Sequence, residues 1–285
     1  MVIDFHVHTF PAKISLRALE SMSQNSRTVY FTDGTTDQLQ QSMQRCGVDY
    51  SVNLPVMTNP GQVEKVNSSM IRDRETLAAR GIIAFGGMHP DYENYKAELR
   101  RLRENGIKGI KIHPAYQNTD LNDIRFKRII DAASNEGLII TTHAGVDIGL
   151  YAHDYATPQM SLEVIRDVSP EKFVLAHMGG WCKWDEVGEL LAGLPVYFDT
   201  AFSLGDLVVR SDEGRPPYAD TNLSNDRFRE LVRAHGAERI LFATDSPWER
   251  QDVYQQRLKD SGLTPDECNA ILGGNAIRLL ALEAE

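Results

Sequence analysis

The stretch VIDFHVH (residues 2–8) is a short apolar run that ends in two histidines. Seven further runs rich in Val, Ile and Phe follow along the chain, at residues 49–55, 82–89, 107–113, 138–143, 173–177, 196–199 and 240–245. Most are nearly continuous apolar segments, which is typical of parallel strands buried on both faces. The sequence therefore predicts eight buried parallel strands.

Segments with helical periodicity lie between these runs. Residues 91–105, 123–137, 160–168 and 184–194 each place apolar side chains on one face, and Gly137 stands where the second would end. Strands that alternate with helices imply βαβ units, and eight such units close a barrel. We therefore predict an α/β fold, a single (β/α)8 TIM barrel in which residues 1–285 form one domain.

Two expected connections are long, residues 9–36 and 200–225. Connections of this length usually form lids or binding loops. The second contains Arg215-Pro216-Pro217-Tyr218, so it cannot be helical throughout.

The composition limits which binding partners and which cellular compartment we expect. The 285 residues carry a formal net charge of −10, which argues against binding nucleic acid by neutralising phosphates. The three widely spaced cysteines indicate neither a disulfide framework nor a zinc ribbon. No signal-peptide pattern opens the chain, and no segment has the roughly 20 apolar residues needed to span a bilayer. We expect a cytoplasmic protein with a small-molecule substrate and no nucleic-acid or membrane partner; a homo-oligomer is compatible with the sequence.

Polar side chains gather at the ends of the predicted strands. Reactive groups of a TIM barrel lie at the C-terminal ends of its strands. Six of the eight histidines and one carboxylate fall at such ends, namely His6, His8, His89, His113, His143, His177 and Asp245. Imidazole and carboxylate are common zinc ligands, and residues two apart on a strand face the same side. A metal site at the barrel mouth is therefore favoured over separate core histidines satisfied by hydrogen bonds.

Lys111 and Asp245 each allow more than one role. A carboxylate that ends a buried strand needs a metal or a partner, although Asp245 could instead cap the following helix. Lys111 shares a strand face with His113. It could be a carbamylated bridge between two metals, a cation that pairs with a substrate carboxylate, or a buried structural lysine, and the last is least attractive because burial disfavours its charge. Trp181 has two roles open to it: packing of the loop after the sixth strand, or substrate binding, since it follows Gly180 close to the expected mouth.

A family resemblance rests on these residues. The ordered set His6-x-His8, His143, His177 and Asp245 resembles the amidohydrolase superfamily. More narrowly, it resembles the branch of TIM-barrel metal-dependent hydrolases that includes aminocarboxymuconate-semialdehyde decarboxylase. Supporting stretches are KGIKIHP (residues 108–114), AHMGG (176–180) and RILFATDSP (239–247). The resemblance extends from Val2 to about Leu280.

The resemblance implies site residues and a cofactor. His6, His8, His143 and Asp245 would hold one divalent metal, with zinc expected and Mn²⁺ or Ni²⁺ as alternatives. A second metal is expected only if Lys111 is carbamylated. His177 and Asp245 would be catalytic, and the candidate substrate-binding residues are Lys111, His113 and Trp181.

Two reactions remain open for such a site. The first is hydrolysis of an amide, ester or lactone bond in a small carboxylated metabolite, since bound zinc lowers the pKa of water to about 7. The second is non-oxidative decarboxylation, a lyase reaction at the same metal. A barrel that only binds is disfavoured because every ligand-type residue is retained.

A second resemblance is local. The stretch GMHP (residues 87–90) is similar to the TatD-type metal-dependent deoxyribonucleases. Those enzymes carry a metal-bridging glutamate on strand four, where this chain has Lys111 and His113. A TatD-like nuclease is therefore only the second alternative function.

Overall fold

The strands form at the predicted runs. The structure is a computed structural model that describes residues 1–210 and 218–282. Its described strands are β1 (Ile3–Val7), β2 (Tyr50–Asn53), β3 (Ile82–Ala84), β4 (Gly86–Gly87), β5 (Gly109–Ile112), β6 (Ile139–Thr142), β7 (Phe173–Leu175), β8 (Tyr197–Asp199) and β9 (Ile240–Leu241). Each of the eight predicted runs contains a strand, and the third run contains two, β3 and β4.

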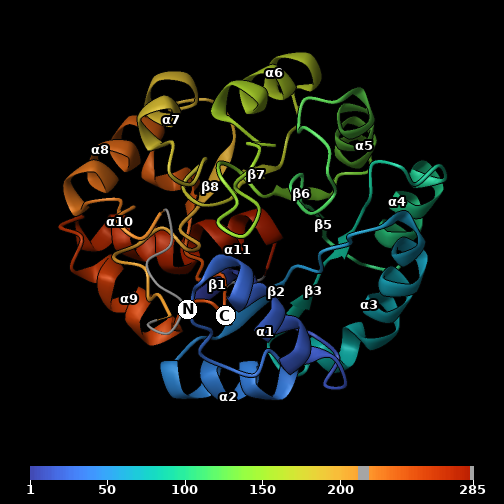
Figure 1. Cartoon of the computed structure of the whole chain (residues 1–285), viewed down its shortest axis with the longest axis horizontal. Coiled ribbons are helices and arrows are strands. Elements are labelled where there is room, and N and C mark those ends of the chain that lie inside the picture. The colour runs from blue at the N-terminus through green and yellow to red at the C-terminus, as the bar shows by residue number, and fades with distance from the viewer. Residues whose placement is uncertain (211–217, 283–285) are drawn as a thin grey trace.

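The strands close into a barrel. Parallel pairing joins β1, β2 and β3 in one ladder and β4 through β9, in order, in another. The N–H of Phe85, between β3 and β4, donates to the carbonyl of Asn53. The seam between β9 and β1 is joined where the N–H of Phe5 donates to Phe242 O, at 2.8 Å, and the N–H of Asp245 to His6 O, at 2.8 Å. The predicted (β/α)8 TIM barrel is thus confirmed (Figure 1).

Helices surround the strands in Figure 1. The described α-helices are α1 (Ser15–Ser26), α2 (Thr36–Cys46), α3 (Val63–Ala78), α4 (Tyr95–Glu104), α5 (Ile124–Asn135), α6 (Pro158–Val168), α7 (Trp184–Leu190), α8 (Asn225–His235), α9 (Gln251–Lys259), α10 (Pro265–Asn269) and α11 (Asn275–Leu280). The four predicted helical segments are confirmed as α4 to α7. Gly137 follows α5 with φ 71°, a left-handed conformation that glycine adopts without strain. No described helix has both the length and the apolar character to cross a membrane.

Two apolar clusters divide the interior. The inner cluster takes side chains from strands around the barrel: Ile3, Phe5, Val52, Leu54, Phe85, Ile139, Val174, Ala201, Leu241 and Ala243, with Ala276 and Leu279 of α11. The outer cluster, between strands and helices, includes Ile110 and Ile112 of β5. Because side chains alternate along a strand, Lys111 between these two points into the barrel.

The first strand departs from strict alternation. Ile3 and Phe5 belong to the inner cluster, but Val7 belongs to the outer one. The pairing of β1 with β2 shifts register between Asp4 and Val7. Such an irregularity re-aims the side chains that follow it. It places His6 and His8 on the interior side, beyond the apolar layer that Phe5 completes.

The two long connections meet each other. The first contains α1, which the sequence did not predict, and the N–H of Val29 beyond this helix donates to Val208 O at 3.0 Å. The expectation that the connection with Arg215-Pro216-Pro217-Tyr218 cannot be helical throughout falls mostly on residues outside the described part of the chain.

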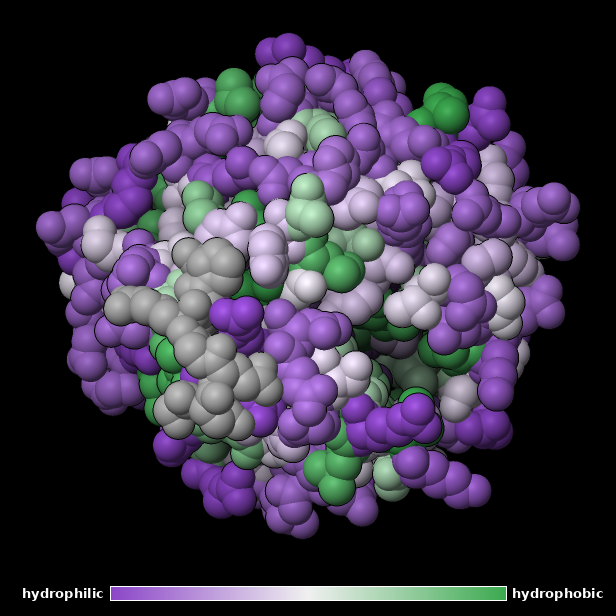
Figure 2. Space-filling view, viewed as in Figure 1, coloured by the Kyte–Doolittle hydropathy of each residue, from purple (hydrophilic) through white to green (hydrophobic). Residues whose placement is uncertain are grey.

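In Figure 2 the face that carries α1 is mainly hydrophilic at its rim, and a hollow near β2 and β3 exposes hydrophobic residues.

Candidate metal centre and active site

Three ligand-type atoms converge where β1 and β9 end. The Nε2 atoms of His6 and His8 are 3.2 Å apart. Oδ1 of Asp245 lies 3.0 Å from Nε2 of His8 and 3.6 Å from Nε2 of His6. Tetrahedral ligands 2.0–2.2 Å from a zinc ion would stand about 3.4 Å from one another. The three atoms therefore have the spacing of ligands around one ion.

Hydrogen bonds on the far side of each ring fix which nitrogen is free. Nδ1 of His6 donates to Oδ2 of Asp199 at 2.9 Å, and Nδ1 of His8 donates to the carbonyl of Leu54 at 2.7 Å. Each neutral ring then presents the lone pair of its Nε2 to the centre. Oδ1 of Asp245 is buried and accepts no hydrogen bond within the described part of the chain. Lys111 Nζ can donate to Nε2 of His6, but within the described residues it bonds to neither of the other two acceptors. His8 and Asp245 therefore face each other at 3.0 Å with no proton between them, and this donor set fits a divalent metal.

The charges of the site agree with this arrangement. Burial alone would raise the pKa of Asp245, whereas positive charge on the neighbouring His6 and His8 rings lowers it below its usual range, and a metal ion between them would act in the same direction. Burial and the charge of Lys111 lower the pKa of His6 well below its ordinary value. A neutral imidazole and an ionised carboxylate are the forms that bind metal.

A buried carboxylate supports the turn that carries Asp245. The backbone N–H and the hydroxyl of Thr244 donate to Asp4 at 3.0 and 2.6 Å, and Gln251 Nε2 donates at 2.9 Å. Asp245 follows with φ 67°, an uncommon left-handed conformation for a residue with a side chain. Backbone strain of this kind persists only where surrounding contacts fix it, as Asp4 does here.

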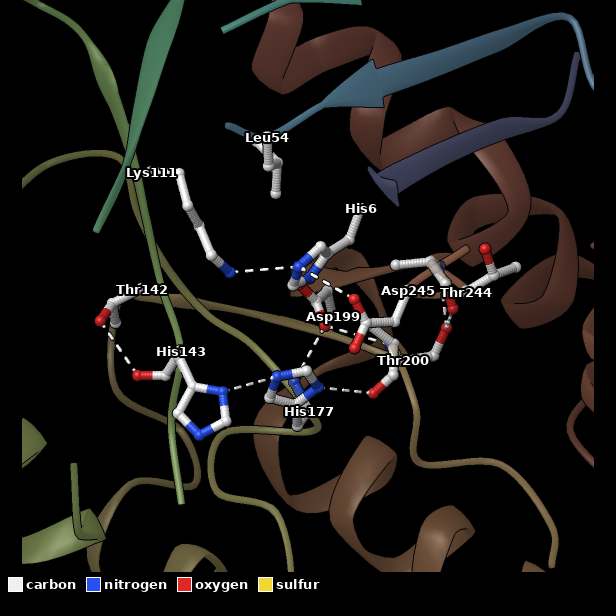
Figure 3. Close-up of polar contacts among 12 residues, drawn as sticks. His6, Leu54, Lys111, Thr142, His143, His177, Asp199, Thr200, Thr244 and Asp245 are labelled. Atoms are coloured by element: carbon white, nitrogen blue, oxygen red, sulfur yellow. Dashed lines mark hydrogen bonds and ion pairs between the residues drawn. The ribbon is translucent and has the colours of Figure 1, made fainter. Parts of the chain in front are cut away.

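Lys111 lies directly beside the candidate metal ligands. Its Nζ is 3.1 Å from Nε2 of His6, and burial lowers the pKa of the amine to about 8 (Figure 3). Asp199 and Asp245 are the charges that oppose this effect. The lysine is thus a buried cation that reaches the centre without a direct carboxylate partner among its described hydrogen bonds.

His143 and His177 form a second pair at the mouth. Nδ1 of His177 donates to the carbonyl of Ala201 at 2.9 Å, and Nδ1 of His143 lies 3.0 Å from Nε2 of His177 (Figure 3). Burial lowers the pKa of His177 to about 4, so this ring is neutral near pH 7. It therefore offers the lone pair of Nε2 to the cavity between the two rings.

His143 also belongs to a second group of ligand-type residues, with His113 and Asp147. One ligand atom from each of the three lies within 4.8 Å of the others. The His113 and His143 rings stack with centroids 4.4 Å apart, and Oδ2 of Asp147 is 3.6 Å from Nε2 of His113. Burial raises the pKa of Asp147 to about 6. Of the four metal ligands predicted, the structure brings His6, His8 and Asp245 into one group and places His143 in this other one.

The remaining predicted residues have structural partners. Trp181 is buried, and its Nε1 donates to Phe202 O at 3.0 Å. Nδ1 of His89 accepts the N–H of Asp91 at 3.2 Å. Sequence reasoning missed two carboxylates of the site, Asp199 and Asp147. Asp199 ends a predicted strand just as Asp245 does, so the same signal could have found it.

The chain matches a known family over nearly all of its length. Residues 3–282 match the sequence profile of the family described as Amidohydrolase. Among curated proteins, none matches the chain.

Solved structures with the same fold include decarboxylases and a hydrolase. The 5-carboxyvanillate decarboxylase of Sphingomonas paucimobilis is 15% identical, with TM-score 0.65 and 99% of each chain covered. A dihydroxybenzoic acid decarboxylase of a Polaromonas species, solved with manganese and 2-nitroresorcinol, is 13% identical, with TM-score 0.68 and coverage of 100% of this chain and 98% of that one. A putative 2-pyrone-4,6-dicarboxylic acid hydrolase of Pseudomonas putida is 17% identical, with TM-score 0.66 and the same coverage. At these identities the likeness establishes the fold.

Proposed function

Since the chain belongs to the amidohydrolase family, we propose that it is a metal-dependent hydrolase of an amide, ester or lactone bond in a small carboxylated molecule. The observation that carries this proposal is the convergence of His6, His8 and Asp245 at the spacing of metal ligands. The convergence lies at the C-terminal ends of β1 and β9, where TIM-barrel active sites are built. The side chains of His8 and Asp245 each keep 13% of their surface exposed, so the centre lies at the edge of solvent.

The proposed ligands are His6, His8 and Asp245, with His143 as the fourth. Zinc is the expected metal, and the manganese in the related dihydroxybenzoic acid decarboxylase makes Mn²⁺ the leading alternative. When bound, the metal would polarise a substrate oxygen and lower the pKa of water.

The proposed residues would also transfer protons and bind the substrate. The carbonyl of Ala201 holds His177 in one tautomer, so its Nε2 can accept a proton or position a substrate oxygen. The carboxylate of Asp245 would be the second catalytic group, because it can accept a hydrogen bond from water or substrate beside the proposed metal. Lys111 would pair with the substrate carboxylate, because it is a buried cation next to the metal ligands.

The test of this function is a substrate panel with two readouts. Metal-loaded protein is incubated with carboxylated lactones, esters and amides. The carboxylic acid product of hydrolysis and the CO₂ released are both quantified. Hydrolysis produces acid without CO₂, and chelation should abolish it. Turnover that releases one CO₂ per substrate would contradict the hydrolase proposal.

Decarboxylation is the second candidate because four of the matching structures are decarboxylases aligned over nearly whole chains. In that reaction Lys111 would hold the carboxylate that is lost. The same assay separates the two candidates, with aromatic and unsaturated carboxylic acids added to the panel.

Metal content is the first testable prediction. We expect about one divalent metal per chain by elemental analysis, because one group of three ligand atoms has metal spacing. An exposed-histidine variant, His153→Gln, is the matched control and should bind the same amount. Failure of the wild-type chain to bind zinc, manganese or nickel after reconstitution would remove the proposed function.

The role of Lys111 gives the second prediction. Lys111→Met should keep one metal and raise KM about 10- to 100-fold, since a charge-assisted hydrogen bond contributes about 1.5–3 kcal/mol. Metal content and KM are measured together, with and without added bicarbonate. Loss of a metal equivalent, or wild-type activity that depends on bicarbonate, would favour the carbamylated bridge instead.

A further inference from the structure

The carboxylate of Asp199, at the end of β8, contacts two different parts of the site. It is fully buried, and its Oδ2 accepts the Nδ1–H of His6, a proposed metal ligand, at 2.9 Å. Its Oδ1 accepts the backbone N–H of His177 at 2.9 Å and that of Ala201 at 3.1 Å. In Figure 3 the carboxylate lies between the His6 and His177 rings, whose centroids are 5.5 Å apart. One side chain therefore joins the proposed ligand set to the segment that carries the proposed catalytic histidine.

The turn that presents His177 has an unfavourable backbone. His177 has φ 61° and Met178 has φ 54°, so two consecutive residues with side chains are in the left-handed region. Such a backbone persists only where surrounding contacts fix it. Asp199 supplies two of these contacts, because its Oδ1 accepts the N–H of His177 and its backbone carbonyl accepts the N–H of Met178 at 2.6 Å. Oδ1 also holds Ala201, whose carbonyl accepts the Nδ1–H of the His177 ring.

The contact with His6 determines which ring nitrogen is free. An ionised carboxylate can only accept, so Nδ1 of His6 carries the proton of the neutral ring and Nε2 keeps its lone pair. Lys111 supports the same tautomer independently, since its Nζ is 3.1 Å from Nε2 of His6 and a lysine ammonium can only donate. The tautomer that can bind a metal through Nε2 is therefore the one that Asp199 stabilises.

A neutral carboxyl that donates to His6 is the competing arrangement. Burial raises the pKa of Asp199 and favours this form, while the charges of His177 and Lys111 oppose it. In that arrangement the ring proton would lie on Nε2, facing the ammonium of Lys111. The two backbone N–H groups that bond to Oδ1 also favour the ionised carboxylate.

We infer that Asp199 is a positioning residue with two functions: its Oδ2 selects the metal-binding tautomer of His6, and its Oδ1 fixes the turn that orients His177. This inference rests on the metal centre and on the role of His177 proposed above. It makes one buried carboxylate responsible for both metal affinity and the placement of the proton acceptor.

Asp199→Asn separates the two contacts. An amide has one accepting oxygen and one donating nitrogen. With the oxygen toward the two backbone N–H groups, the nitrogen faces His6, whose proton must then move to Nε2. Zinc affinity, measured by competition with a chromophoric chelator, should fall about 10- to 100-fold, the usual effect of removing such a partner. Asp199→Ala should weaken zinc binding as well and should also release the turn at His177.

Heteronuclear NMR of the ring nitrogens in metal-free protein measures both functions without a substrate. The His6 and His177 signals are assigned by their loss in His6→Gln and His177→Gln. In the wild-type chain the proton of His6 should be on Nδ1, and in Asp199→Asn it should be on Nε2. The slowly exchanging Nδ1–H of His177 should persist in Asp199→Asn and be lost in Asp199→Ala. A residue that only stabilises the fold would not reverse a tautomer.

Glu98→Gln is the matched control, because it changes another buried carboxylate to an amide outside the site, where Glu98 bonds to Asn67 and Arg101. It should leave zinc affinity and the His6 tautomer unchanged, and thermal unfolding checks that each variant is folded.

A wild-type His6 with its proton on Nε2 would overturn the inference. So would an Asp199→Asn chain with an unchanged tautomer or unchanged zinc affinity. If the tautomer reverses but the wild-type chain binds no zinc, the positioning of His6 stands and the proposed metal centre is overturned instead.

Discussion

Asp245→Asn is expected to lose both metal and turnover. The carboxylate supplies the buried Oδ1 that lies 3.0 Å from His8, and the amide removes its charge. Loss of a base typically costs about 10²–10⁴ in rate, and the loss of a charged ligand adds to it. The measurements are zinc per chain after dialysis and kcat at saturating zinc.

The control for this substitution is Asp252→Asn on α9, where the exposed carboxylate pairs with Arg250. It removes the same charge from an exposed side chain outside the proposed ligand set and should leave zinc content and kcat unchanged. An Asp245→Asn protein that retains one zinc and turns over at the wild-type rate would show that Asp245 is neither ligand nor base.

His177→Ala is expected to keep the metal and still lose about 10²–10⁴ in kcat. Its Nδ1 is held by Ala201, and its Nε2 faces the site, so truncation removes a positioned proton acceptor. His143→Ala should show the opposite behaviour, with weaker zinc binding and activity partly restored by excess zinc. Comparing zinc content and kcat across these two variants separates a catalytic role from a ligand role.

The pH profile adds an independent check on His177. Burial lowers its pKa to about 4, and a neutral ring is the form that accepts protons. Activity due to this group is therefore fully present above about pH 5 and is lost only as pH falls through 4.

Loss of zinc from His177→Ala as large as that from His143→Ala would identify His177 as a ligand and favour a two-metal centre.

The barrel and much of its site could be predicted because strand ends carry a simple signal. An apolar run marks each strand, and the polar residue that ends it must lie at the mouth of a parallel barrel. This reasoning located His6, His8 and Asp245, which the structure brings within 3.6 Å of one another.

Other parts of the site have no comparable signal. Asp147 lies four residues beyond its strand, where a carboxylate is ordinarily solvated, and only the folded connection buries it. His8 bonds to the backbone carbonyl of Leu54. Because every residue has a carbonyl, the sequence does not show which one is the partner. The register shift in β1 depends on how it pairs with β2, so alternation within residues 2–8 could not reveal it. Apolar periodicity could not reveal α1, because three of its four buried residues are serines.

The seam between β9 and β1 sets when the site can exist during folding. The contact of Thr244 with Asp4 joins residues 240 positions apart, and the proposed ligands His6 and Asp245 flank it. Closing so long a loop costs conformational entropy, which is offset only after the contacts have formed, and such contacts form slowly. A chain still emerging from the ribosome holds His6 and His8 but not Asp245. The proposed three-ligand centre therefore forms only after the barrel closes, so a metal bound there cannot template the early steps of folding.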